Sequence, residues 1–268
     1  MSSLRVTELN IYPVKSCGGI GLTDMTVSHW GPEWDRRIMV VDEHHSFVTA
    51  RKYPRLLQVK TALTHDGLRL SVKGKTDLHI DLKEVGSNEQ ANPDAKVWRD
   101  QVGALSAGAS ADLWFSSLLG TSVKLVYMPD TSFRQVDRRY FDQKQRVSFA
   151  DGFPLLLTHQ SSLDELNQRL QIPLPMTRFR PNIVVAGGKP WAEDNWQNIR
   201  IGGMDFLAVK PCSRCVMTTI DPTTLASSPE PLRTLKEYRR TDLGIIFGQN
   251  LVNLENGMIA VGDKVEVQ

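Results

Sequence analysis

The stretch Leu56–Val72, LLQVKTALTHDGLRLSV, contains two apolar runs on either side of a sharp turn signal. The dipeptide Asp66-Gly67 separates them, and Asp-Gly between alternating apolar segments is a strong short-range predictor of a β-hairpin. A further run at Leu78–Leu82 again alternates apolar and polar residues. We therefore predict a small antiparallel β-structure in this part of the chain.

Further strand patterns lie on both sides of this hairpin. Val6–Tyr12 alternates with period two and stops at Pro13, as a strand should. Arg37–Val41 and Ser46–Ala50 flank a polar break, and this pattern predicts a second hairpin. Three more strand-like segments follow in the C-terminal half: Pro181–Gly187, Ile199–Gly202 and Met258–Val267.

Helical patterns are fewer. Ser110–Leu119 has helical spacing and ends at Gly120, a typical C-terminal stop. Ser162 and Glu165 have the spacing of a capping box, in which each side chain binds a free backbone amide at a helix start. Pro231–Tyr238 begins with a proline, which the first helical turn tolerates. Many short strands with few helices predict a mainly β, α+β fold of the barrel or sandwich type.

The composition excludes several classes of protein. The 268 residues carry 32 Lys+Arg and 30 Asp+Glu, a balance that does not indicate nucleic-acid binding. No stretch approaches the roughly 18 apolar residues of a membrane helix, and the first residues lack the pattern of a secretory signal. The three cysteines are too few for a disulfide-rich secreted fold or for the usual iron–sulfur ligand set. We predict a cytoplasmic protein with no membrane and no nucleic-acid partner.

Two of these cysteines, Cys212 and Cys215, carry the sharpest chemical signal. A structural zinc site would need more ligands than the chain offers nearby. A thioredoxin-type pair would need a helix start, which the following β-branched residues and Asp-Pro turn disfavour. Two buried, inert thiols at a strand edge are the simplest structural interpretation. The remaining interpretation is a single thiolate ligand, favoured by Lys210 and Arg214, for a metal that arrives inside an organic cofactor.

Five segments in sequence order resemble landmarks of the MOSC family, named for the C-terminal domain of molybdenum-cofactor sulfurases. The segments are Ile11–Cys17, Phe149–Gly152, Phe179–Val185, Lys210–Pro222 and Phe247–Asn250. They are similar to the subgroup that contains the mitochondrial amidoxime-reducing components and their bacterial relatives. The resemblance implies a MOSC β-barrel plus a smaller N-terminal β-rich module. We expect the N-terminal module at residues 1–95 and the MOSC domain at residues 96–268, with loop composition at Gly86–Pro93.

The resemblance also implies a molybdenum–molybdopterin cofactor held between the two modules. Cys215 would be the molybdenum ligand and a catalytic residue, whereas Cys212 does not occupy the family's ligand position. Asp151 is assigned a catalytic or substrate-loop role as a hypothesis. Cofactor contacts are implied at Lys15, Ser16, Arg36, Arg180, Asn182, Ser213, Arg214 and Asn250. The residue types agree, because Arg and Lys suit a phosphate and an asparagine offers both donor and acceptor to a pterin edge.

The activity implied by the resemblance is two-electron reduction of an N–O bond in small N-hydroxylated compounds, such as amidoximes and hydroxylamines, to amines. Electrons must come from an external donor, since the sequence has no Gly-x-Gly-x-x-Gly fingerprint for a nicotinamide or flavin cofactor. Some bacterial relatives carry a plant-type ferredoxin domain after the MOSC domain, so we expect a separate or fused ferredoxin-like protein or flavin reductase. The proton donor is open among Asp151, His159 and Asp221.

Two alternatives remain at this point. The first is a sulfur carrier that uses a persulfide on Cys215 or Cys212, which would need the same cationic surroundings. The second is a non-catalytic carrier of the molybdenum cofactor.

Overall fold

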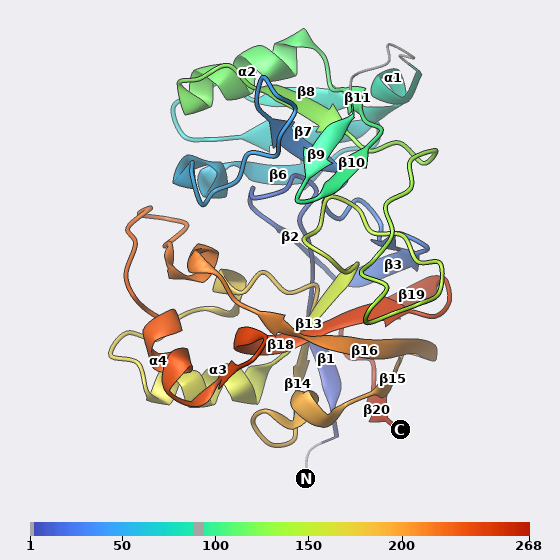
Figure 1. Cartoon of the computed structure of the whole chain (residues 1–268), viewed down its shortest axis with the longest axis vertical. Helices are drawn as coiled ribbons and strands as arrows, with labels where there is room; N and C mark the ends of the chain where they lie inside the picture. The colour runs from blue at the N-terminus through green and yellow to red at the C-terminus, as the bar shows by residue number, and fades with distance from the viewer. Residues whose placement is uncertain (1–2, 88–93) are drawn as a thin grey trace.

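Short strands dominate the described part of the chain, residues 3–87 and 94–268 of the computed structural model (Figure 1). The strands are β1 (Arg5–Ile11), β2 (Ile20–Leu22), β3 (Asp24–Ser28), β4 (Gly31–Pro32), β5 (Ile38–Val41), β6 (Lys60–Leu63), β7 (Gly67–Ser71), β8 (Leu78–Asp81), β9 (Ala95–Val97), β10 (Asp100–Val102), β11 (Leu105–Ser106), β12 (Lys124–Tyr127), β13 (Leu155–His159), β14 (Ile183–Ala186), β15 (Asn198–Ile201), β16 (Met204–Ser213), β17 (Arg240–Thr241), β18 (Gly244–Asn253), β19 (Gly257–Ala260) and β20 (Val265–Val267). The α-helices are α1 (Leu82–Ser87), α2 (Ala109–Leu119), α3 (Gln160–Gln168) and α4 (Leu232–Tyr238), and the 3-10 helices are η1 (Pro54–Gln58), η2 (Met176–Arg178), η3 (Ala192–Asn195) and η4 (Val216–Thr219). This confirms the predicted mainly β, α+β fold class.

The largest sheet has nine strands, eight of them in the order β2-β1-β14-β13-β18-β16-β15-β20, while β17 pairs with β18. Strand β14 lies inside this sheet and is a continuous apolar run. Val184 packs on one face against Leu163 and Leu166 of α3, whereas Ile183 and Val185 join the core on the other face. A strand that is covered on both faces is expected to be apolar throughout, and β14 follows that rule.

A second layer is built on the hairpin β6-β7, which confirms the prediction from Asp66-Gly67. Strand β8 extends it to three strands, and α2 covers it with the fully buried side chain of Phe115. Gly67 is required by space, because a Cβ there would collide with the carbonyl oxygen of Ile80. Helix α2 ends at Gly120 in the left-handed conformation, as its sequence predicts.

Two predicted strand segments are wrong in part. Residues 56–58 belong to the 3-10 helix η1, because Pro54 occupies its first turn. The predicted second hairpin is confirmed in part: Phe47 forms an antiparallel bridge to Val41 and the amide of Val48 donates to the carbonyl of Val40, but residues 46–50 contain isolated bridges and no continuous strand. The physical reason is a turn that follows directly, in which the carbonyl of Thr49 accepts the amides of Lys52 and Tyr53.

Helix α1 was not predicted. Its start is capped by Asp81, whose Oδ1 accepts the backbone amides of Lys83 and Glu84. Residues 86 and 87 of the predicted loop close this helix. Residues 88–93 of that loop lie outside the described residues.

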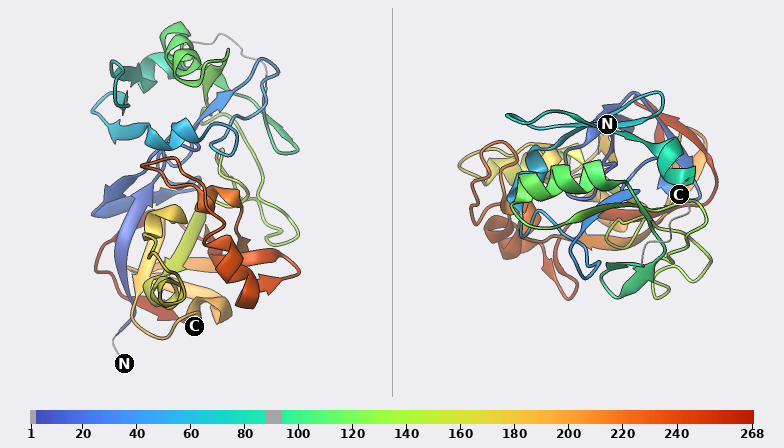
Figure 2. Two further views of the ribbon diagram at one scale, coloured as in Figure 1. Left: turned by 90° about the vertical axis from the view of Figure 1, so that its left-hand side faces the viewer. Right: turned by 90° about the horizontal axis from the view of Figure 1, so that it is seen from above.

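The two layers share the chain in an interleaved manner. In Figure 1 the layer of β6, β7, β8 and α2 lies above the large sheet. Strand β1 pairs with β14 and β3 pairs with β19, so N-terminal strands complete sheets that the C-terminal half builds (Figure 2). The ends of the described chain also meet, since Arg5 bridges Lys264. The boundary between residues 95 and 96 stays a prediction.

The predicted capping box at Ser162 is wrong. Helix α3 begins at Gln160, and the side chain of His159 accepts the amide of Ser161 at its start. Ser162 is therefore the third residue of the helix and fully buried. Its hydroxyl donates to the buried carboxylate of Glu193 at 2.8 Å and accepts the amide of Trp191. The side chain of Ser162 therefore makes tertiary contacts in place of the predicted helix cap.

Burial raises the pKa of Glu193 to about 7, against the opposing hydrogen bond from Ser162. The folded protein therefore keeps a proton on Glu193 between its ordinary pKa of 4.5 and about 7, where the unfolded chain loses it. The free energy of unfolding should fall as the pH rises through this window, by about 3 kcal/mol. We expect Glu193→Gln to remove this loss, so that the variant gains stability over the natural protein between pH 5 and pH 8. Urea unfolding of both proteins at pH 5 and at pH 8 measures the free energy of unfolding. The same pH dependence in the variant and the natural protein would contradict the role of Glu193.

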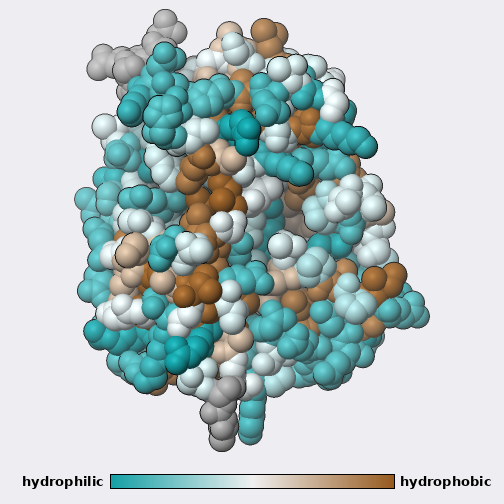
Figure 3. Space-filling model, turned by 180° about the vertical axis from the view of Figure 1, so that it is seen from behind, coloured by the Kyte–Doolittle hydropathy of each residue, from teal (hydrophilic) through white to brown (hydrophobic). Residues whose placement is uncertain are grey.

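The outer surface is largely hydrophilic, with an apolar strip near the middle of the face seen from behind (Figure 3). Among the described residues, no helix is both long and apolar enough to cross a membrane. The predicted cytoplasmic location stays a prediction.

Candidate functional site

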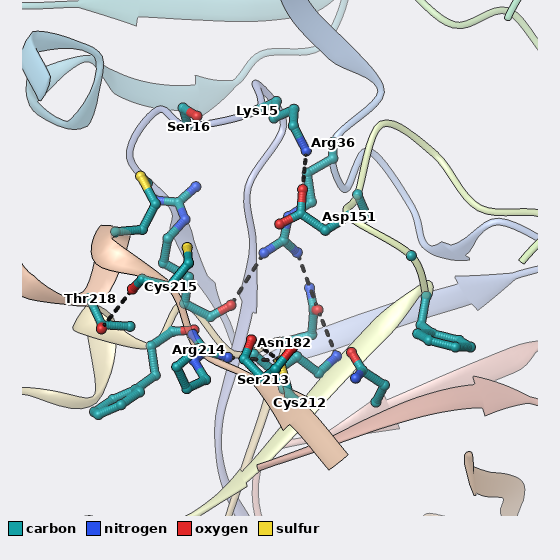
Figure 4. A pocket seen from close by; sticks show the side chains of 18 of the residues that line it. Lys15, Ser16, Arg36, Asp151, Asn182, Cys212, Ser213, Arg214, Cys215 and Thr218 are labelled. Atoms are coloured by element: carbon teal, nitrogen blue, oxygen red, sulfur yellow. Dashed lines mark hydrogen bonds and ion pairs between the residues drawn. The ribbon is translucent and has the colours of Figure 1, made fainter. Parts of the chain in front are cut away.

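Loops at the junction of the two layers line a cavity of about 150 Å³ (Figure 4). It receives side chains from the loop after β1, the approaches to β5 and β13, the loop between η2 and β14, the end of β16, and β18. All ten residues predicted for the site line it: Lys15, Ser16, Arg36, Asp151, Arg180, Asn182, Ser213, Arg214, Cys215 and Asn250. The structure brings these residues together, while the role of each stays a prediction.

Three of these residues have a backbone conformation that ordinary residues avoid. Ser16, Arg36 and Arg180 have φ angles of 72°, 50° and 55°, in the left-handed region. Such conformations cost about 1–3 kcal/mol each and concentrate at functional sites. The fold thus holds the three backbones in unfavourable conformations while all three residues line the same cavity.

Two guanidinium groups are held on the ring of Tyr12. The Cζ of Arg36 lies 4.5 Å and that of Arg180 lies 4.1 Å from the ring centroid. Burial raises the pKa of Tyr12 to about 12, so the ring stays neutral and its hydroxyl donates to the carbonyl of Pro181. Arg36 is paired with the buried carboxylate of Asp35 at 2.6 Å. The aromatic ring thus holds two positive charges near each other.

Arg180 differs from Arg36 in its partners. Its Nη2 is buried and has no hydrogen-bond partner among the described residues. Burial, with a smaller contribution from the neighbouring charge of Arg36, lowers the pKa of Arg180 to about 10 against the opposing effect of Tyr12. A buried donor without an acceptor is costly, so this group calls for an acceptor from a bound molecule.

Arg214 has a similar unpaired atom on another wall of the cavity. Its Nη2 donates to the carbonyl of Phe179 at 2.6 Å, and its Nη1 lies 3.0 Å from the Sγ of Cys212. Its Nε is buried without a partner among the described residues. Of the two cysteines in the motif, Cys212 is therefore the one whose sulfur contacts the guanidinium.

Cys215 follows directly at the start of η4, with its side chain partly exposed on the cavity. Its carbonyl accepts both the amide and the hydroxyl of Thr218 (Figure 4), which fixes the backbone of the turn. The 3-10 helix η4 corrects the expectation that no helix follows the pair, although it spans four residues only.

The third cysteine belongs to the core. Burial raises the pKa of Cys17 to about 12, so this thiol is neutral and inert. Across residues 3–87 and 94–268, no group of three or more His, Cys, Asp and Glu side chains is arranged to hold a metal ion. The structural-zinc interpretation therefore has no ligand set in this part of the chain.

Lys15 and Asp151 form an ion pair at the cavity wall. Lys15 Nζ lies 2.5 Å from Asp151 Oδ1 (Figure 4). It also donates to the carbonyl of Phe149. Burial lowers the pKa of Lys15, although the charge of Asp151 opposes this. Desolvation would raise the pKa of Asp151, but the charge and hydrogen bond of Lys15 hold it far below its usual range. At neutral pH Asp151 is therefore a carboxylate.

The two asparagines are tied to the protein frame. Asn182 is buried, and its Oδ1 accepts the amide of Leu156 and an Nη1 hydrogen of Arg36, while its Nδ2 donates to the carbonyl of Asn10. Asn250 on β18 donates to the carbonyl of Lys210 on β16. Both residues therefore position the walls of the cavity.

Sequence reasoning missed other lining residues, among them Thr49, Arg51 and Arg178. Arg51 lies outside every motif, and the turn that begins at Thr49 brings it to the cavity. Two of the three proton-donor candidates do not line it: His159 is buried at the start of α3, and Asp221 pairs with Arg178.

The comparisons agree with these motifs. A family model described as the MOSC N-terminal beta barrel domain matches residues 3–122, and one described as the MOSC domain matches residues 144–266. The chain is 34% identical to the mitochondrial amidoxime-reducing component 1 of Mus musculus, over 97% of this chain and 81% of that protein. For the component 1 of Homo sapiens the identity is 34%, over 97% and 82%.

A more distant relative belongs to a larger protein. The chain is 30% identical to a molybdenum cofactor sulfurase of Oryza sativa subsp. japonica, over 96% of this chain and 33% of that protein. With both MOSC models matched and with the identity spread over nearly the whole chain, this protein belongs to the MOSC family that includes the mitochondrial amidoxime-reducing components.

Proposed function

We propose that this protein binds a molybdenum–molybdopterin cofactor and reduces small N-hydroxylated compounds to the corresponding amino compounds, amidoximes to amidines and hydroxylamines to amines. The observation that carries the proposal is the arrangement of the cavity. The partly exposed sulfur of Cys215 shares it with two guanidinium groups that each have an unpaired, buried donor. The names of the mouse and human relatives support this choice of reaction.

The residues fit such a cofactor in two respects. The unpaired donors of Arg180 and Arg214 suit the phosphate of molybdopterin, since charge-assisted hydrogen bonds to phosphate are strong. A cysteine thiolate is a soft ligand, appropriate for one metal atom that the organic part of the cofactor also holds. Bound in this way, the cofactor would supply the two-electron chemistry, as cofactors generally do.

The protein's own residues would position the reaction and manage its protons. Reduction of an amidoxime takes up two electrons and two protons and releases water. Asp151 is a carboxylate at neutral pH, so it does not itself carry a proton to the substrate. Its charge instead favours the ammonium form of Lys15, whose proton then sits at the cavity wall. Asp151 would thus act by keeping a proton in place on Lys15.

Electrons would come from a partner protein. We propose a ferredoxin-like protein or a flavin reductase as the donor, separate or fused.

A second candidate function is sulfur transfer through a persulfide on Cys212 or Cys215. The contact between Arg214 and the sulfur of Cys212 favours it, as does the identity with the rice sulfurase. A non-catalytic cofactor carrier is the third possibility, and one experiment separates all three.

The experiment uses holo-protein from a host that makes the molybdenum cofactor. Molybdenum is measured by elemental analysis, and benzamidoxime is offered with reduced methyl viologen while benzamidine is followed by chromatography. We expect molybdenum in stoichiometric amount together with benzamidine formation. Cyanide-releasable sulfur without benzamidine would support sulfur transfer instead. Bound molybdenum with neither product would leave the carrier function.

A further inference from the structure

Trp98 occupies an unusual place beside the cavity. The pairing of Val97 with Asp100 leaves Trp98 and Arg99 as the two-residue loop of the β9-β10 hairpin. The side chain of Trp98 is 49% exposed, whereas the other tryptophans, all among the described residues, are buried or partly buried. Its φ angle is 56°, in the left-handed region.

Both features work against a purely structural role. Two-residue hairpin loops favour Asn, Asp or Gly where φ is positive. A large aromatic ring in water also forgoes the burial that normally stabilises it. An unfavourable backbone conformation that holds a large side chain in solvent indicates a function when that side chain lies beside a binding site.

The contacts of Trp98 connect it to the cavity. Its Nε1 donates to Oδ1 of Asp151 at 3.4 Å. The Cζ of Arg51 lies 4.8 Å from one of its rings, and Arg51 and Asp151 both line the cavity. The ring of Phe47 packs against it with centroids 4.9 Å apart, and the same Phe47 ring lies 5.8 Å from Lys15 Nζ. We call Phe47, Arg51 and Trp98 together the aromatic lip.

We propose that the aromatic lip selects flat aromatic N-hydroxylated substrates, with Trp98 as the specificity-determining residue. This inference rests on the proposed reductase function and names the substrate class that the same site prefers. A planar aromatic ring can stack on the exposed indole with its N–O group directed toward Lys15 and Asp151. The guanidinium of Arg51 tolerates a neutral amidoxime but repels the cationic amidine that forms from it, and this repulsion would favour product release.

The test compares two substrates on the holo-protein, benzamidoxime and the small aliphatic acetamidoxime, with reduced methyl viologen as electron donor. Trp98→Ala removes the ring, while Trp98→Phe keeps an aromatic face and loses the hydrogen bond to Asp151. Leu113→Ala is the matched control, since Leu113 is 71% exposed on α2 outside the cavity. The readout is the ratio of kcat/KM for benzamidoxime to that for acetamidoxime.

We expect Trp98→Ala to lower this ratio about tenfold through KM, as the loss of one aromatic stacking partner predicts. Trp98→Phe and Leu113→Ala should keep the ratio within about twofold. An unchanged ratio in Trp98→Ala, or an equal loss with both substrates, would overturn the proposal and leave Trp98 a structural role.

A binding measurement keeps this test separate from the proposed activity. Isothermal titration of benzamidoxime into the oxidised holo-protein reports affinity without turnover. If the natural protein reduces neither substrate, the proposed function fails. In that case the proposed selectivity of the aromatic lip is still supported if benzamidoxime binds and Trp98→Ala weakens the binding about tenfold. Equal binding to both proteins, or none to the natural protein, overturns it.

Discussion

Replacement of Cys215 by alanine should lower benzamidoxime turnover by about a thousandfold or more, equivalent to ~4 kcal/mol of transition-state stabilisation. The reason is that this substitution removes the proposed thiolate ligand, the one protein atom expected to touch the metal. Molybdenum content should fall less than turnover, because Arg180 and Arg214 would still bind the phosphate of the cofactor. Elemental analysis and steady-state kinetics on the same preparation measure both quantities.

Cys212→Ala is the matched control for this experiment. Its sulfur lines the same cavity and contacts Arg214, but the family pattern does not make it the ligand. We expect this variant to keep turnover within about fivefold of the natural protein, since a single contact to a guanidinium is modest. Equal losses in the two variants, or a larger loss in Cys212→Ala, would contradict the assignment of Cys215.

Arg180→Met should weaken cofactor retention by about ten- to a hundredfold, the effect of losing a charge-assisted hydrogen bond. The stability of the cofactor-free protein should not fall with it. Arg180 has no carboxylate partner among the described residues, and burial and Arg36 both lower its pKa, so its positive charge is unfavourable in the folded protein. Loss of molybdenum on dialysis and thermal unfolding of the apo-protein are the two measurements.

Arg36→Met provides the contrast. Arg36 pairs with Asp35, whose side chain is buried, so the substitution leaves a buried carboxylate without its ion-pair partner. We expect this variant to lose both cofactor and stability, the latter by ~2–4 kcal/mol. If instead Arg180→Met unfolds at lower temperature and retains its molybdenum, Arg180 has a structural role only.

The sequence predicted the parts of the fold that depend on local patterns. The Asp66-Gly67 turn and the alternation of Val6–Tyr12 specify their hairpin and strand through neighbouring residues alone, and both are confirmed. The predicted cap at Ser162 failed because a distant carboxylate, Glu193, competes for the same hydroxyl. Such a tertiary contact leaves no trace at the spacing of a capping box.

The residues of the candidate site also fall into those that the sequence predicts and those that it does not. Residues inside motifs, such as Cys215 and Arg180, could be named in advance, and the cavity contains them. Arg51 and Trp98 could not, because neither belongs to a motif. A turn whose geometry depends on the folded layers brings Arg51 to the cavity, and another brings Trp98 against the lining residues Asp151 and Arg51. A tryptophan in a two-residue hairpin loop is a signal that only the backbone angle makes visible.

The pairing of β1 with β14 has a consequence for how the protein is made. Strand β1 ends at Ile11 and pairs on one edge with the nearby β2, but its neighbour on the other edge, β14, begins at Ile183. At ribosomal speeds of about 5–20 residues per second, the first strand must wait roughly 10–35 seconds for its partner to be synthesised. During that interval the edge of β1 that faces β14 lacks its partner, and an unpaired strand edge is a site where other chains can pair.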